Sequence, residues 1–132
     1  MPYFYLENGV FRMDLSLLGK SPAELKKYNL RLSRLKLFPY WGDNLYHVKY
    51  AVNHLKLDFF FEDDALKIVA YDEKGDFDQE RVKSAQKLFG EGLPAGETFW
   101  RWNFPEQITF EMFGELMLET DTHCFRQRYM LQ

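Results

Sequence analysis

Cysteine is almost absent from this sequence, in which Cys124 is the only one. A single thiol excludes a disulfide framework and zinc modules that are held by several cysteines. No apolar stretch approaches the roughly 20 residues of a membrane-spanning helix, so none is expected. The opening residues, MPYFYLENG, lack the basic start and apolar stretch of a signal peptide. We therefore expect a cytoplasmic protein.

Motifs of the common binding and catalytic chemistries are also missing. The glycines at 90, 92 and 96 fit neither a dinucleotide-binding nor a P-loop spacing, and no serine lies in a GxSxG motif. The three histidines form neither an HExxH nor an HxH pattern. Strand and helix signals do not alternate regularly, which disfavours a parallel nucleotide-binding sheet. The sequence therefore predicts no metal and no cofactor.

Aromatic residues are abundant, by contrast: the 132 residues include 13 Phe, 8 Tyr and 3 Trp. Each ring can bury on the order of 150–250 Å², which helps a small domain to form a sufficient core. The length predicts one globular domain over residues 1–132. Most of the rings are expected in its core, and the alternative is that some line a pocket or an interface.

Alternation of apolar and polar side chains predicts that much of the chain is β-strand. Asn8-Gly9 lies between two apolar runs and predicts a hairpin, because both residues tolerate positive φ. Segment 106–118 fits a strand by alternation and a helix by its Glu, Met and Leu content, so both remain open. The predicted strands are 2–6, 10–15, 44–52, 54–61, 65–71, 98–104 and 123–131.

The first predicted helix spans about 21–37. Ser21 and Glu24 can form a capping box, and apolar residues recur at helical spacing after it. Basic residues on the same segment follow a second stripe, which would bind an acidic partner or RNA; the alternative is a solvated helix face. The stripe consists of Lys20, Lys27, Arg31 and Arg34.

The second predicted helix spans about 77–89, with Asp76 as its N-cap and Gly90 in the left-handed position that ends it. Together the elements predict an α+β fold. We expect a mainly antiparallel, twisted sheet of about six to eight strands with both helices packed on it.

Charge is unevenly distributed along the chain. Residues 1–50 carry a balance of +4 and residues 51–132 a balance of −7, so the net charge is −3. An acidic chain is a poor candidate for binding nucleic acid. The acidic side chains gather in two predicted turns, which would bind a partner or would simply be solvated. They are Glu62, Asp63, Asp64, Asp72, Glu73, Asp76 and Asp78.

The strand around residues 99–104 combines two tryptophans with an arginine. Trp100 and Trp102 share one predicted face and Arg101 lies on the other. Trp and Arg dominate the energetics of protein interfaces, so these residues are candidate anchors for a partner. The alternative is a strand buried on both faces.

These features favour a small acidic cytoplasmic domain that binds another protein. Immunity proteins that neutralise nuclease toxins, and inhibitors encoded by phages, share this size and charge. Such a domain would act by covering a basic surface of its partner, because complementary charge speeds association.

Two alternatives remain. One is a domain that binds a small apolar ligand in an aromatic pocket. The other is an enzyme with a nonstandard site. The pocket would be lined by Tyr46, Tyr50, Phe59, Trp100, Trp102 and Phe110, and the enzyme site would use His47, His54, Asp58 and Arg101.

Overall fold

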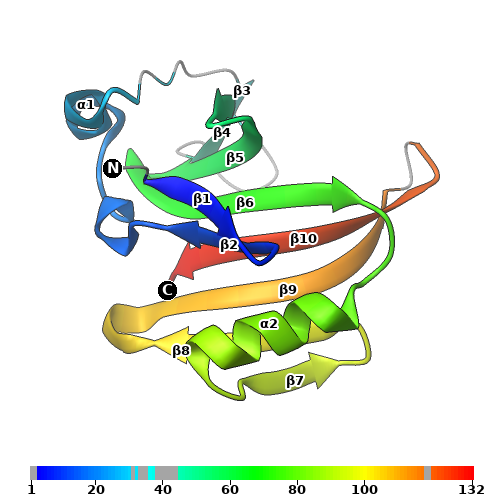
Figure 1. The fold of residues 1–132 in the computed structure, drawn as a ribbon. Coiled ribbons are helices and arrows are strands. Elements are labelled where there is room, and N and C mark those ends of the chain that lie inside the picture. The colour runs from blue at the N-terminus through cyan, green and yellow to red at the C-terminus, as the bar shows by residue number, and fades with distance from the viewer. Residues whose placement is uncertain (1–2, 31, 33–35, 38–44, 118–119) are drawn as a thin grey trace.

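A computed structural model describes residues 3–30, 32, 36–37, 45–117 and 120–132. It confirms the α+β fold: an eight-stranded sheet is accompanied by a two-stranded hairpin and two helices (Figure 1). Every strand pairing among these described residues is antiparallel, in agreement with the predicted mainly antiparallel sheet.

The elements have the following bounds. The strands are β1 (Phe4–Glu7), β2 (Val10–Met13), β3 (Lys36–Leu37), β4 (Leu45–Val52), β5 (Leu55–Glu62), β6 (Ala65–Lys74), β7 (Leu93–Gly96), β8 (Phe99–Phe104), β9 (Ile108–Met117) and β10 (Thr122–Leu131). The helices are α1 (Pro22–Leu25) and α2 (Gln79–Phe89), and the short 3-10 turns are η1 (Leu15–Leu17), η2 (Lys26–Tyr28) and η3 (Pro105–Gln107).

The large sheet consists of two meanders joined side by side. Its strand order is β3-β4-β5-β6-β10-β9-β8-β7, so the last strand of each meander meets the other at the centre. Segment 106–118, which fitted either a strand or a helix, contains β9, because β8 and β10 pair with it on both sides. Pairing on both sides satisfies the backbone hydrogen-bonding groups of β9. This outweighs the local helix propensity of its Glu, Met and Leu residues.

The predicted hairpin is confirmed. Its turn residues Asn8 and Gly9 have φ of 52° and 79°, the left-handed values that a type I′ turn requires. Figure 1 shows the hairpin lying across the middle of the large sheet. There Phe4 packs edge-on against Phe59 and Phe11 packs against Tyr129, so the hairpin closes the core above β5 and β10.

Helix α2 covers the other half of the same side of the sheet (Figure 1). It begins after Asp78, which accepts a hydrogen bond from the Glu80 backbone, rather than after the predicted cap Asp76. The helix ends at Gly90 as predicted, but with φ of 94° and ψ of −175° this residue takes an extended positive-φ conformation open to glycine and not the predicted left-handed one. At its C-terminal end Phe89 packs edge-on against Trp102 and Phe110, which joins the helix to the core.

The first predicted helix is much shorter than 21–37. The capping box of Ser21 and Glu24 forms as expected, but α1 and η2 end at Asn29, whose φ is 63°. Leu30 and Leu32 are buried without being helical, so the core is filled here without a helix. Further on, Lys36–Leu37 pairs with β4 as a strand. Tertiary packing and strand pairing therefore outweigh helix propensity here.

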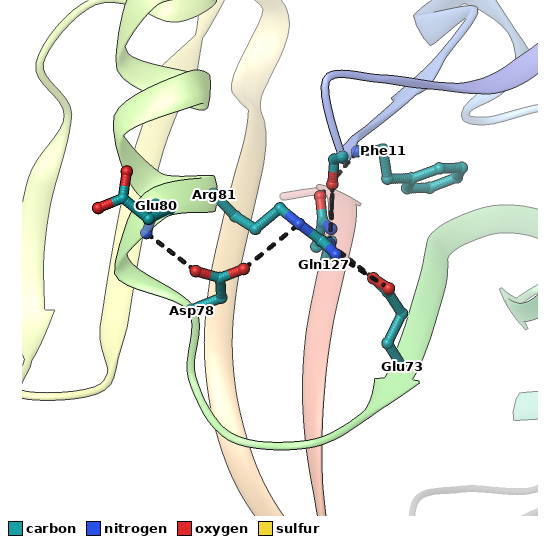
Figure 2. A network of polar contacts seen from close by, with 7 residues as sticks. Phe11, Glu73, Asp78, Glu80, Arg81 and Gln127 are labelled. Carbon is teal, nitrogen blue, oxygen red and sulfur yellow. Dashed lines mark hydrogen bonds and ion pairs between the residues drawn. The ribbon is translucent and has the colours of Figure 1, made fainter.

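A polar network fixes the hairpin to the sheet (Figure 2). The side chain of Gln127 is fully buried; its amide donates to the Gly9 carbonyl at 2.9 Å and its oxygen accepts from the Phe11 amide at 2.7 Å. Arg81 of α2 donates to the same Gly9 carbonyl at 3.1 Å, and it also binds Glu73 and Asp78. One arginine thus connects helix, hairpin and sheet.

Tyr129 supplies a third hydrogen bond to the hairpin, since its hydroxyl donates to the Phe11 carbonyl at 2.6 Å. Burial raises the pKa of this phenol above its usual 10.0, so the folded protein retains a proton that the unfolded chain releases. The stability that depends on this proton is complete below pH 10 and is lost as the pH rises above 10.

We expect Tyr129→Phe to lower the free energy of unfolding by about 1–2 kcal/mol at neutral pH, because the hydrogen bond is lost. The difference between the two proteins should shrink above pH 10, where only the wild type loses stability through this group. Urea unfolding at several pH values measures both effects. A difference that stays constant above pH 10 contradicts the assignment to Tyr129.

Candidate binding surface

Among the residues that the structure describes, helices and the hairpin cover only one face of the large sheet. The hairpin and α2 lie on the same side of the sheet (Figure 1), and the buried apolar cluster takes its strand residues from that side. We call the opposite side the open face. Because side chains alternate along a strand, Arg101, Glu111 and Arg128 project onto it from β8, β9 and β10.

A buried carboxylate lies at the centre of the open face. Glu111 is only 2% exposed, and each of its oxygens accepts from a different arginine. The Arg101 Nε lies 2.8 Å from Oε2 and the Arg128 Nε lies 2.8 Å from Oε1. The two guanidinium groups replace the water that the carboxylate would otherwise require, and they leave this trio with one excess positive charge.

Aromatic rings lie beneath the arginines. Phe99 and Phe113 stack with centroids 5.0 Å apart across β8 and β9. The Arg128 guanidinium lies 4.7 Å from the Phe113 centroid, and that of Arg101 lies 5.5 Å from Phe99. The positive charge over each ring face is favourable, and the rings hold the guanidinium groups in place.

Arg126 extends this arrangement toward β6. It donates to both oxygens of Asp72, at 2.6 and 2.9 Å, and also lies 3.3 Å from Glu115. The hydrogen bonds to Asp72 raise the pKa of Arg126. The guanidinium lies 5.9 Å from the Phe113 ring centroid. We call Arg101, Arg126 and Arg128, together with Phe99 and Phe113, the arginine patch.

The predicted acidic residues fall into two separate groups. Glu62, Asp63 and Asp64 lie at the turn that precedes β6, whereas the others lie at or beyond its far end. Only residues 65–71 lie between Asp64 and Asp72, and this length of strand separates the groups by roughly 25 Å. Most members of the second group bind a basic side chain: Asp72 binds Arg126, Glu73 and Asp78 bind Arg81, and Asp76 lies 3.7 Å from His123.

The two tryptophans of β8 lie on the covered face. Trp102 is 2% exposed and its indole nitrogen donates to the Gly90 carbonyl at 2.9 Å. Trp100 is partly exposed and donates to the Glu91 carbonyl at the same distance. Both side chains therefore fix the chain that leaves α2, while Arg101, as predicted, projects from the other side of the strand.

The residues of the predicted aromatic pocket pack on one another and on the core. Tyr46 stacks on Phe61, Tyr50 packs edge-on against Phe59, and Phe110 contacts Trp102. Tyr46 also lines a cavity of about 330 Å³ with Leu32 and Ser21, at the start of α1. In the described part of the chain, the pocket that these rings were expected to share is filled by the rings themselves.

The predicted enzyme site is brought together only in part. His47 and Asp58 meet across β4 and β5, with Nε2 and Oδ1 2.6 Å apart. His54 lies in the turn between these strands, and Arg101 lies on β8, beyond β6, β10 and β9. The four residues therefore form no common site.

The predicted basic stripe is not carried by one helix. Lys20 precedes α1 and Lys27 lies in η2, so the stripe that helical spacing implied is interrupted at Asn29. Arg31 and Arg34 lie outside the described residues.

Comparison with known proteins does not identify the function. No protein-family model, curated protein or solved structure matches this chain. Within the described ranges, no helix has the length and apolar character to cross a membrane. The same residues contain no cluster of three or more His, Cys, Asp or Glu side chains that could hold a metal ion.

Sequence reasoning missed most of the arginine patch. The available signal was the i, i+2 spacing of Arg126 and Arg128, which places both on one face of a strand. Glu111 gave no such signal by itself, because its two arginine partners belong to different strands. Strand order had to be known before these charges could be matched.

Proposed function

We propose that this protein is a non-enzymatic domain that binds another protein with the open face of its sheet. The arginine patch is the observation that carries this proposal. Its arginine side chains remain 20–42% exposed although each one is held in place by a carboxylate. Arginine and phenylalanine are enriched in the cores of protein interfaces, and a side chain that is already ordered loses little entropy on binding.

The Arg101 end of the patch favours a partner with an acidic surface, whereas at the other end Asp72 and Glu115 already neutralise Arg126. The trio of Arg101, Glu111 and Arg128 has one excess positive charge, and Arg101, with 42% of its side chain exposed, can still donate outward. An inhibitory role, and the binding of a basic surface by the acidic turns, remain predictions.

The experiment is capture of partners from the native lysate with tagged protein, quantified by mass spectrometry. We expect Arg101→Ala to reduce the captured partner about tenfold or more, as removal of a central interface arginine does. Lys87→Ala is the matched control, because Lys87 is exposed on α2, on the opposite side of the sheet. Circular dichroism and thermal unfolding establish that both variants are folded.

Equal capture by the wild type, Arg101→Ala and Lys87→Ala contradicts the proposal. Loss of capture with Lys87→Ala alone would place the binding surface on α2 and would also contradict it.

A further inference from the structure

Three lysines project from neighbouring strands onto the half of the open face that the arginine patch does not occupy. Lys49 lies on β4 directly opposite Asp58 of β5, Lys56 lies two residues before Asp58, and Lys74 lies near the end of β6. They line one cavity of about 600 Å³ together with Asp58 and Asp72. We call this the lysine cavity.

The carboxylates of the lysine cavity are already occupied, whereas its lysines are not. Asp58 is bound by His47 at 2.6 Å, and both oxygens of Asp72 accept from Arg126. Among the described residues, the side chains of Lys49, Lys56 and Lys74 form neither a hydrogen bond nor an ion pair. The cavity thus places three ammonium groups beside only two carboxylates, which already bind His47 and Arg126, and this excess of positive charge favours the binding of an anion there.

The lysine cavity is continuous with the arginine patch. Asp72 lines the cavity and binds Arg126, whose guanidinium lies against Phe113 of the patch. An occupant of the cavity can therefore be part of a molecule that also covers the patch. Ala51, which lies on the same face of β4 as Lys49, adds apolar lining, which suits the methylene groups of glutamate side chains.

We propose that the lysine cavity receives an acidic segment of the partner protein, with at least two carboxylates placed among the three lysines. This rests on the proposed function, because it takes the same open face as the binding surface. The carboxylates of the partner would supply the counter-charges that the lysines lack, and the arginine patch would contact the adjoining surface.

Fluorescence anisotropy with a labelled hexaglutamate peptide tests the lysine cavity directly. The cavity variant is Lys56→Gln with Lys74→Gln. The matched control is Lys83→Gln with Lys87→Gln on α2, which changes the net charge by the same amount. We expect the wild type and the control to bind the peptide, and the cavity variant to bind about tenfold or more weakly. Binding should also weaken as salt is raised.

Equal weakening by both double variants would mean that only net charge matters, and would overturn the proposal. So would failure of the wild type to bind the peptide. Inorganic pyrophosphate, tested for binding by calorimetry, distinguishes a small-anion site. If pyrophosphate binds through Lys56 and Lys74 but the peptide does not, the cavity serves a free anion and not a protein segment.

Capture from the native lysate separates this inference from the proposed function. If capture depends on Arg101 but is unchanged in the cavity variant, the open face binds the partner and the lysine cavity does not receive it. If capture depends on neither, both proposals fail. Dependence on both, with stronger loss at high salt, is the expected result.

Discussion

Replacement of Gln127 by leucine should lower the free energy of unfolding by about 4 kcal/mol. The side chain is fully buried and makes two hydrogen bonds to the hairpin, with the Phe11 amide and the Gly9 carbonyl. Leucine fits the space but satisfies neither group, and each unsatisfied buried polar group costs about 1–3 kcal/mol. Arg81 still donates to the Gly9 carbonyl, which limits the loss at that atom.

Urea unfolding of the wild type and of Gln127→Leu measures this effect. Gln79→Leu is the matched control. It makes the same Gln-to-Leu substitution at an exposed position in the first turn of α2. We expect the control to change stability by less than about 0.5 kcal/mol.

Gln127→Glu tests the donor separately. The carboxylate can still accept from the Phe11 amide but cannot donate to the Gly9 carbonyl, so this variant should recover stability at low pH, where the carboxyl is protonated. If Gln127→Leu and its control Gln79→Leu have the same urea midpoint of unfolding, the network of Figure 2 does not stabilise the hairpin.

Replacement of Glu111 by alanine should cost about 3 kcal/mol. The carboxylate is the shared partner of Arg101 and Arg128, and its removal leaves two guanidinium groups beside each other without a counter-charge. Breaking a buried ion pair on one side costs about 3–5 kcal/mol, and the partial exposure of both arginines places this case at the lower end.

Glu115→Ala is the control for Glu111→Ala. Glu115 is on the same strand and face, but its side chain is 44% exposed and its contact with Arg126 is one of several that Arg126 makes. We expect a loss of less than about 1 kcal/mol there.

Combining Glu111→Ala with Arg101→Ala in a double-mutant cycle isolates the ion pair, and the double variant should lose less than the sum of the two single losses. Additive losses would mean that Arg101 and Glu111 do not interact in solution, and would remove the support for an ordered arginine patch.

The candidate surface shows where sequence reasoning succeeds and where it stops. Arg101 was predicted to lie on the opposite face from Trp100 and Trp102, because alternation within one strand fixes that relation. Its partner Glu111 could not be predicted, since the pairing of β8 with β9 depends on the register of two strands. The same holds for Arg126 and Asp72, which are 54 residues apart in the chain.

Local signals also misled after Ser21. The capping box formed as predicted, but the helical turns end at Asn29, and Leu32, which helical spacing placed on the apolar stripe, is buried without being helical. Helical periodicity shows which residues will be buried, and not whether the backbone between them is helical when strand pairing is available.

The sequence by itself determined the hairpin at Asn8-Gly9, the helix ending at Gly90 and the successive strands β4, β5 and β6, because each depends on residues within a few positions of one another. The tertiary structure alone decided that β10 joins the two meanders, that β9 is a strand, and which charged residues meet on the open face. Those features depend on pairing between distant segments, and the free energy of that pairing comes from contacts that no local pattern contains.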